Sequence, residues 1–316
     1  MDLDSFLKGL TQLRRGVTPY GPAPHKPILI LTLLDLIESG HISDDRFYIN
    51  AELVSAFHEN WDLLAPTGFK EDFTLPFYHL QNDKLEGFAF WNIQTLPGAL
   101  LDKHIKSIHT LAEIVEFASL TLPVFHLLTQ QKNRDAVRLS LIHTYFPFSK
   151  ERYFEGRGNR GSYLHAVEDY VLNEIPKVMR LQVAEEEWVY VRNWTFKKMV
   201  PEIYQNTCAI SGMKVSSSQG KYLIDACHIV PFSRDQDDQV TNGIALCPNL
   251  HRAFDAGLIT IDSEYRVMVS RSVTEDKSHP YALTALDGKN ILLPRERYQW
   301  PSQENLETHR TSKFKC

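Results

Sequence analysis

The spacing of apolar residues predicts two helices in the front part of the chain. The segment "PILILTLLDLIESG" (27–40) is apolar on most faces, begins with proline and ends with glycine, as a buried helix does. In "AELVSAFHENWDLL" (51–64), Leu53, Phe57 and Trp61 recur at helical spacing. Both segments are therefore expected to be helical.

Two segments further along have the composition of strands instead. "FTLPFYHLQND" (73–83) and "FAFWNIQTL" (88–96) are rich in aromatic and β-branched residues, and a turn is expected between them. Helical periodicity returns over residues 109–146. Residues 1–150 therefore predict a mixed domain of helices and a small sheet, in an α+β protein.

A glycine-rich segment, "GRGNRGS" (156–162), interrupts the regular pattern and predicts a flexible joint. We place a linker over residues 151–187, between a first domain at 1–150 and a second domain at 188–316. Three arginines of this linker could follow a DNA backbone or simply be solvated: Arg152, Arg157 and Arg160.

Two strands and a helix are predicted close together in the second domain. "LIDACHIVPF" (223–232) predicts a strand, and "NGIALC" (242–247) begins with an Asn-Gly turn signal and continues as a second strand. "PNLHRAFDAG" (248–257) has the proline start and the glycine end of a helix. Four polar residues of this unit could face one point: Asp225, His228, Asn242 and His251.

These side chains suit the hydrolysis of a phosphodiester. A divalent metal would polarise the scissile phosphate, while a neutral histidine takes a proton from the attacking water. Histidine suits that role because it titrates near neutral pH. An amide such as Asn242 could accept the ring N–H of the histidine and fix its orientation. A single histidine at a strand end is more often structural, so only the whole group indicates a nuclease.

The composition is that of a globular protein with room for two domains. The chain has 316 residues, of which 43% are hydrophobic and 23% are charged. No apolar run reaches the ~18 residues of a membrane-spanning helix, and the start, "MDLDSFLKGL", lacks the layout of a signal peptide. We therefore expect a cytoplasmic protein without a membrane partner.

The net charge of −5 argues against a surface covered with phosphate-binding lysines, although a local basic groove could still bind DNA. The acidic residues Asp235, Asp237 and Asp238 are expected to form a solvated loop, because carboxylates facing DNA would repel it. Four cysteines without paired spacing are expected to be buried thiols: Cys208, Cys227, Cys247 and Cys316.

The segments "CAISG", "LIDACHIVPF" and "NGIALCPNLHRAFDAGLITID" together resemble the HNH, or ββα-metal, endonuclease motif in its restriction-enzyme form. The resemblance implies that His228 is the general base, Asn242 the central asparagine and His251 a ligand of Mg²⁺ or Mn²⁺. Asp225 would be the carboxylate ligand, although relatives often carry a ligand at the position that Cys227 occupies here.

Many such relatives also bind a structural zinc through two C-x-x-C pairs. Here Cys208 is followed by Ser211, and Cys247 by Leu250, so one cysteine of each pair is missing. No structural zinc is therefore predicted, and packing is expected to hold the hairpin.

Three segments within residues 1–150 resemble the sulfur-binding domain of phosphorothioate-dependent type IV restriction enzymes: "RGVTPYGPAPHKPILILTLLDLI", "LPFYHLQND" and "NRDAVRLSLIHTYFP". Sulfur in place of a phosphate oxygen is softer and more weakly hydrated, so an apolar pocket favours it while basic residues hold neighbouring phosphates. The candidates for this surface are Tyr20, Pro22, Ala23, Pro24, His25, Lys26, Pro76, Phe77, Tyr78 and His79.

The two resemblances predict an endonuclease whose first domain finds phosphorothioated double-stranded DNA and whose second domain cuts nearby. Two alternatives stay open: a first domain that reads a methylated or hydroxymethylated base, and a non-catalytic reader that uses the HNH fold as a scaffold. The prolines could also only shape a loop, and Phe77 could be a core residue. A homodimer is expected because two nuclease copies most easily cut both strands.

Overall fold

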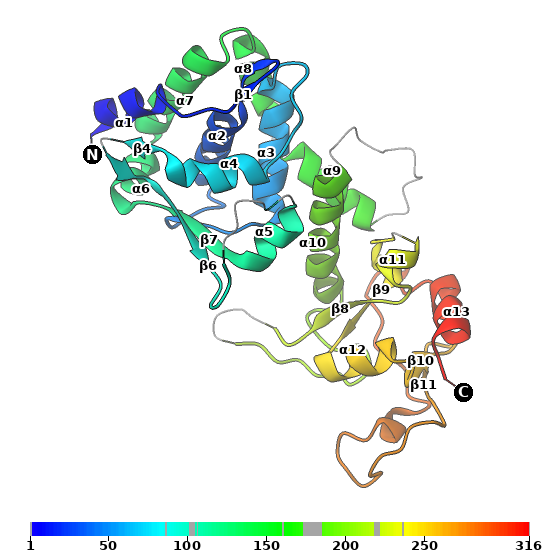
Figure 1. The fold of residues 1–316 in the computed structure, drawn as a ribbon. Helices are drawn as coiled ribbons and strands as arrows, with labels where there is room; N and C mark the ends of the chain where they lie inside the picture. Colours follow the sequence, from blue (N-terminus) through cyan, green and yellow to red (C-terminus); the bar gives the residue numbers. More distant parts are fainter. Residues whose placement is uncertain are drawn as a thin grey trace. The chain divides into compact units, whose positions relative to one another are not determined.

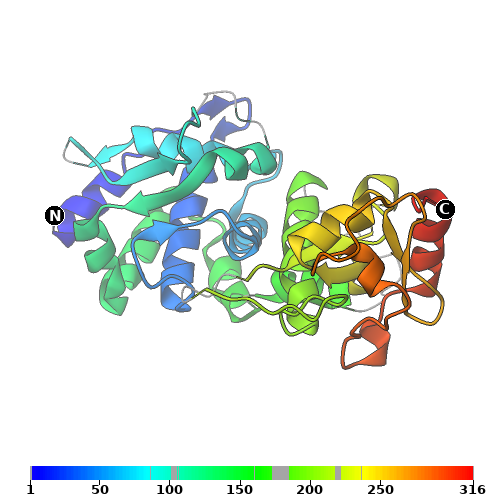
Figure 2. The same cartoon turned by 90° about the horizontal axis from the view of Figure 1, so that it is seen from below.

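The computed structural model divides into two compact units (Figures 1 and 2). It describes residues 2–85, 87–100, 105, 107–159, 161–172, 185–217, 222–235 and 237–315. The first unit comprises Met1–Ala166 with Arg180–Val191, and the second comprises Val167–Met179 with Arg192–Cys316. Both units contain helices and small sheets, which confirms the predicted α+β class.

Two helices form the centre of the first unit. α2 (His25–Glu38) is buried along nearly its whole length and packs against α3 (Ala51–Leu64). Other helices also pack on α2, so apolar side chains on most of its faces are buried. α3 begins where the Asn50 side chain accepts a hydrogen bond from the Leu53 backbone at 2.9 Å. Both predicted helices are confirmed.

A three-stranded antiparallel sheet in the first unit has the order β3 (Arg46–Phe47), β7 (Val115–Leu120), β6 (Trp91–Thr95). The predicted strand at 88–96 is thus confirmed for β6. The expectation of helix throughout 109–146 is wrong, because α5 (Ile108–Ile114) gives way to β7. β7 pairs on both sides, and this tertiary pairing overrides the helical periodicity of its neighbours.

The segment 73–83 was expected to be a strand, but it forms α4 (Thr74–His79) and the 3-10 helix η1 (Leu80–Asn82). The Asp72 carboxylate stabilises the start of the helix. Its Oδ1 accepts hydrogen bonds from two backbone N–H groups of the first turn, at 2.9 and 3.2 Å. The aromatic composition reflects burial of one helical face, which carries Phe73, Phe77 and Leu80.

The described residues of the predicted joint at 156–162 are largely helical. α8 (Lys150–Gly156) ends at Gly156, and a side chain there would lie 2.4 Å from Leu63, so this glycine allows close helix packing. Residues of α9 (Ser162–Leu172) and α10 (Glu185–Ile203) are divided between the two units. The other elements up to residue 203 are α1 (Leu3–Leu10), β1 (Val17–Thr18), β2 (Gly21–Pro22), β4 (Lys84–Leu85), β5 (Phe88–Ala89), α6 (Leu122–Thr129), α7 (Gln131–Tyr145), α8 (Lys150–Gly156), η2 (Arg157–Asn159), α9 (Ser162–Leu172) and α10 (Glu185–Ile203).

The second unit contains a hairpin with a helix packed on it (Figure 1). β8 (Asp225–His228) pairs antiparallel with β9 (Gly243–Leu246), and α12 (Pro248–Asp255) packs on both strands. The predicted strand, strand and helix are confirmed. The remaining elements are α11 (Phe232–Asp235), η3 (Val240–Asn242), β10 (Ile259–Ile261), β11 (Val267–Val269), η4 (Leu283–Leu286), η5 (Arg297–Gln299) and α13 (Gln303–Ser312).

The described helices include none that combines the length and the apolar character needed to cross a bilayer.

Candidate active site

Strand β8 presents its side chains to two sides of the hairpin. Asp225 and Cys227 are two residues apart and face α12, whereas His228 faces α10. Asp225 Oδ2 lies 3.3 Å from His251 Nδ1, so the structure brings these two predicted site residues together. His228 lies on the other side of the strand, in a separate cluster.

Helix α12 adds a residue that the sequence analysis missed. Asp255 lies one turn after His251, and its Oδ2 is 3.3 Å from His251 Nε2. The imidazole therefore lies between two carboxylates, Asp225 at Nδ1 and Asp255 at Nε2. The spacing of four residues in "HRAFD" could have indicated this pair.

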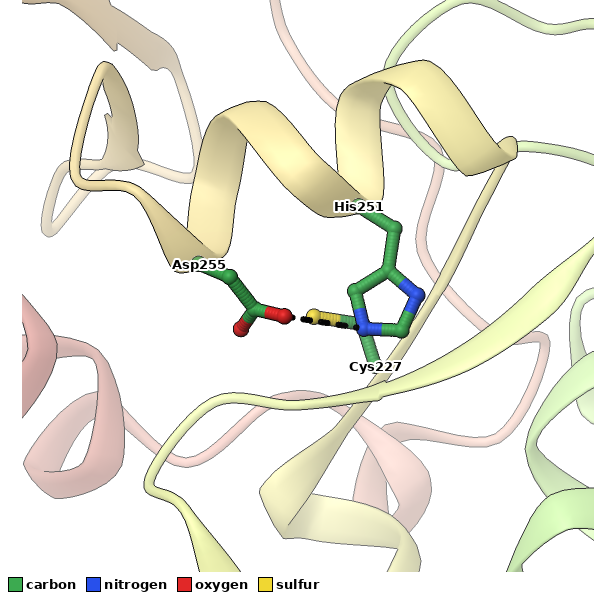
Figure 3. Close-up of side chains that lie close together, drawn as sticks. All are labelled: Cys227, His251 and Asp255. Carbon is green, nitrogen blue, oxygen red and sulfur yellow. Dashed lines mark ion pairs between the residues drawn. The ribbon is translucent and has the colours of Figure 1, made fainter.

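The Cys227 sulfur completes a group of three potential metal ligands. Ligand atoms of Cys227, His251 and Asp255 all lie within 4.8 Å of one another (Figure 3). Cys227 is fully buried, and this burial raises the pKa of its thiol well above the ordinary value. Asp255 and Asp225 raise that pKa further. A metal ion is the usual partner that allows a thiolate to exist in such a place.

His228 is held by an aromatic ring and a carboxylate. Its imidazole stacks on Phe196 of α10, with ring centroids 3.9 Å apart and planes 10° from parallel. Its Nε2 lies 2.7 Å from Asp238 Oδ1, and Arg192 Nε donates to the other oxygen of Asp238 at 2.9 Å. The ring is 17% exposed, so water can still reach it.

The acidic loop differs from the expectation. Asp238 has no exposed surface, so it is not a solvated carboxylate as predicted. A buried carboxylate needs compensating partners, which Arg192 and His228 supply. Asp237 is partly buried, and this burial raises its pKa. The side chain of Asp235 lies outside the described residues.

Asn242 does not orient the imidazole as expected. Its Oδ1 accepts a hydrogen bond from Val230 N at 2.9 Å, and its Nδ2 donates to Val230 O and Asp237 O at 3.0 and 2.9 Å. The Asn242 amide therefore hydrogen-bonds both ends of the loop between β8 and η3, and so stabilises the conformation of that loop. Asp238, at the end of that loop, is the group that contacts the His228 ring.

Gly243 is not the second residue of a tight turn, contrary to the Asn-Gly signal. It has an extended backbone, with φ −119° and ψ 145°, and it pairs with His228 in the ladder. A Cβ there would lie 2.5 Å from Val200 and 3.0 Å from Phe196. The missing side chain therefore lets α10 approach the hairpin and lets Phe196 stack on His228.

Cys208 and Cys247 lie together at another place in the second unit. A hydrogen bond between their side chains lowers the pKa of Cys208 and raises that of Cys247. Ser211 N donates to the Cys208 sulfur at 3.5 Å. These residues occupy three of the four positions of the C-x-x-C pairs, so the two retained cysteines meet although the other two positions have changed.

In the first unit, the predicted sulfur-binding turn is partly exposed. Tyr20 is 65% exposed and packs beside Phe69, with ring centroids 5.9 Å apart. Pro22 lies in β2, and Ala23 N donates to Gly16 O at 2.8 Å. Pro24 directly precedes α2. The turn is therefore rigid and presents an aromatic ring to solvent.

His25 and Lys26 are occupied inside the first unit. The His25 ring packs 4.6 Å from Trp61, its Nε2 is 3.0 Å from Lys70 O, and burial lowers its pKa. The Lys26 ammonium forms a buried ion pair with Asp83. Neither side chain contacts solvent in the way that the predicted role at a phosphate requires.

Several of the other predicted DNA contacts also have internal partners. Pro76 and Phe77 are buried, and Phe77 lies against Trp91 with ring centroids 5.4 Å apart, so it is a core residue. Tyr78 and His79 are half-buried. Arg152 donates to Asp62 O, and Arg157 pairs with Glu38 at 2.7 Å. Arg160 lies outside the described residues.

Comparison with known proteins identifies one segment of the second unit. The sequence model of a protein family described as HNH endonuclease matches residues 208–262, which include β8, β9 and α12. This segment is therefore an HNH endonuclease domain, and both clusters described above contain residues from it. No curated protein matches the chain.

Three solved structures show a similarity at low identity. A modification-dependent TagI restriction endonuclease is 22% identical, with a TM-score of 0.31 over 38% of this chain and 38% of that chain. The sulfur-binding domain of SprMcrA complexed with phosphorothioated DNA is 20% identical, with a TM-score of 0.36; the match covers 46% of this chain and 86% of that chain. The corresponding domain of ScoMcrA is 19% identical, with a TM-score of 0.34; the match covers 44% of this chain and 86% of that chain.

Proposed function

We propose that the chain, whose residues 208–262 form an HNH endonuclease domain, is a metal-dependent DNA endonuclease directed to phosphorothioated DNA. The observation that carries the nuclease activity is the arrangement of two histidines on opposite sides of one hairpin. His251 lies between carboxylates, and His228 is fixed by Asp238 with one ring nitrogen still available.

His228 is the proposed general base. Stacking on Phe196 and the contact with Asp238 restrict its ring, so Nδ1 can take a proton from water without prior reorientation. The proposed role of Asp238 is positioning, since it touches the histidine at the nitrogen that would not take the proton. Asn242 supports this arrangement by fixing the loop that carries Asp238.

His251 and Asp255 are the proposed metal-holding residues. A divalent ion bound there would polarise the scissile phosphate and stabilise the leaving oxygen. Asp225 contacts His251 at Nδ1, which leaves Nε2 directed to the metal side, as carboxylates behind metal-binding histidines do. Asp225 therefore orients the ligand in this proposal, in place of the ligand role that the sequence predicted.

The first unit is the proposed reader of the sulfur. The support comes from the "APHKP" resemblance and from the exposed, apolar β1–β2 turn, where Val17 is 90% and Tyr20 is 65% exposed. His25 and Lys26 have internal partners, so in this proposal they do not contact phosphates. Their role is to stabilise the turn that precedes α2.

The nuclease proposal is tested with a plasmid nicking assay in Mn²⁺, with and without a chelator. We expect chelation to stop nicking and His228→Ala to reduce it about 10³-fold, because a positioned base contributes 10²–10⁴-fold. His279→Ala is the matched control, since His279 is an exposed histidine of the same unit. Undiminished nicking by His228→Ala would exclude the assigned base, and no nicking by the unaltered chain would favour a non-catalytic reader.

The sulfur preference is tested separately by measuring affinity for one duplex in three forms: unmodified, with a single Rp phosphorothioate, and with 5-methylcytosine. We expect the sulfur-bearing duplex to bind most tightly, and Tyr20→Ala to remove that advantage. Equal affinity for the sulfur-bearing and unmodified duplexes would refute the proposed substrate, and tighter binding of the methylated duplex would favour a base reader.

A further inference from the structure

We infer that the Cys227 sulfur is a third metal ligand beside His251 and Asp255, and that this site therefore selects a thiophilic ion such as Zn²⁺ over Mg²⁺. The inference rests on the proposed function, because it names the class of metal at the same nuclease site. It also changes the expectation of Mg²⁺ or Mn²⁺ that came from the resemblance alone.

The geometry fits one ion between the three side chains. Their ligand atoms lie within 4.8 Å of one another, and His251 Nε2 is 3.3 Å from Asp255 Oδ2. Ligands that bind Zn²⁺ at about 2.0–2.3 Å in a tetrahedron lie about 3.3–3.8 Å apart. Small side-chain shifts would thus place the three ligand atoms at three corners of a tetrahedron around the ion. The fourth position would stay open for water or phosphate, as in catalytic zinc sites.

The backbone already holds the three residues in this arrangement. Cys227 is in the β8–β9 ladder opposite Ile244, and His251 and Asp255 are on one face of α12 (Figure 3). All three therefore belong to regular elements that pack on each other, and binding would order little further chain.

The chemistry of the donor set decides the class of ion. Mg²⁺ binds oxygen ligands in octahedral geometry and retains several waters, whereas a thiolate favours softer ions. One sulfur, one imidazole nitrogen and one carboxylate oxygen are a set that Zn²⁺ accepts in tetrahedral geometry. When the ion binds, the proton of the Cys227 thiol leaves to solvent, so the sulfur acts as a thiolate.

The surroundings of Cys227 differ from those of an inert core thiol. Its sulfur is buried, yet it lies beside the imidazole of His251 and the carboxylate of Asp255 rather than among apolar groups alone. Asp225 and Lys313 also act on it electrostatically. The two carboxylates, which also contact His251, contribute negative charge that attracts a cation, and the Lys313 ammonium offsets it in part.

The test uses Co²⁺ as a spectroscopic substitute for Zn²⁺, titrated into the full-length chain without DNA. Thiolate bound to Co²⁺ gives a near-ultraviolet charge-transfer absorption that nitrogen and oxygen ligands do not give. We expect this absorption at one equivalent, its loss in Cys227→Ser, and its displacement by Zn²⁺ but not by excess Mg²⁺. Zn²⁺ affinity should fall about 100-fold or more in Cys227→Ser, since losing only an outer-shell partner already costs about 10–100-fold.

The Cys208 and Cys247 pair is the main competing source of thiolates, so Cys208→Ser is the matched control. The inference requires the absorption to persist in Cys208→Ser and to disappear in Cys227→Ser. Persistence in Cys227→Ser, or loss in Cys208→Ser, would overturn it. Circular dichroism and His251→Ala guard against misfolding, because His251→Ala should weaken Co²⁺ binding while the cysteine remains.

This outcome is independent of the nuclease assay. A cobalt absorption that depends on Cys227 in a chain that never nicks DNA would refute the proposed function and keep the metal assignment. Nicking supported by Mg²⁺, with no such absorption, would keep the proposed function and refute the thiolate ligand.

Discussion

The loop around His228 and the turn before α2 each place a histidine next to a buried charged pair, and the two histidines differ in what those pairs leave free. Near His228, Asp238 bonds both the ring and Arg192, and the ring keeps an exposed edge. Near His25, Lys26 and Asp83 are both buried, Asp83 also accepts a hydrogen bond from Arg14 N at 2.7 Å, and His25 is 8% exposed.

The difference shows that a charged residue in a motif has a chemical meaning only once its partner is known. Asp238 looked like a solvated acid but holds a histidine, whereas Lys26 looked like a phosphate contact but neutralises a buried carboxylate. His309 extends the comparison within the second unit. It stacks on Phe254 at 3.7 Å, much as His228 stacks on Phe196, but its nitrogens contact Phe254 O and Thr260.

The largest effect is expected from breaking the pair in the first unit. Lys26→Met should lower the free energy of unfolding by about 3 kcal/mol, because Asp83 would remain buried without its counter-charge. Urea denaturation followed by tryptophan fluorescence measures this change. Lys26→Met combined with Asp83→Asn should recover part of the loss, as expected for a coupled pair.

One outcome for Lys26→Met would show that Lys26 is not a buried structural charge, and the contrast with Asp238 would then fail. If stability were unchanged while DNA affinity and its salt dependence both fell, Lys26 would be a phosphate contact after all.

A smaller effect on the reaction is expected from Asp238→Asn. Nicking should fall about 10–100-fold while DNA affinity stays the same, because the variant weakens the group that positions His228. Asp238 also pairs with the buried Arg192, so activity is compared at a temperature at which circular dichroism shows the variant folded. Asp237→Asn is the neighbouring control, since the Asp237 carboxylate accepts a hydrogen bond from Gln239 N and acts on His228 only through its charge. Equal losses in both variants would mean that the loop as a whole, and not the contact with His228, is responsible.

The smallest effect is expected from His309 at mildly acidic pH. Burial lowers its pKa to about 4, below the ordinary value of 6.5. Below about pH 6.5 the unfolded chain therefore binds a proton that the folded chain does not, and stability falls as pH decreases towards 4. The loss should be about 0.8 kcal/mol at pH 6, less than the effects expected from the two variants above, and should grow as the pH falls further.

Urea denaturation of the full chain at several pH values measures this loss. His309→Gln should flatten the pH dependence between 6.5 and 5, and His279→Gln, at an exposed position, should leave it unchanged. A pH dependence retained in His309→Gln would assign it to other groups.

The sequence predicted the elements whose local pattern agrees with their packing. α2 and α3 have helical patterns and helical neighbours, and the β8, β9 and α12 unit has start and stop signals at its ends. α4 was mistaken for a strand because its aromatic residues reflect burial, and β7 was missed because its pairing on both sides comes from distant segments.

The candidate site could be predicted only in part, for a similar reason. His251 and Asp255 are four residues apart and could be paired from the sequence. Arg192 and Asp238 are 46 residues apart, and nothing local indicates that they meet. The burial of Cys227 beside the His251 ring likewise depends on how α12 crosses the hairpin.

Gly243 carries no functional group, yet it limits which sequences could present His228 in this way. Any other residue at this position would place a carbon within 2.5 Å of Val200 and push α10 away from the strand. A search for the same arrangement among natural or designed sequences could therefore require an absent side chain opposite the histidine, together with the histidine itself. The empty position would then be as informative a filter as the residues that carry the chemistry.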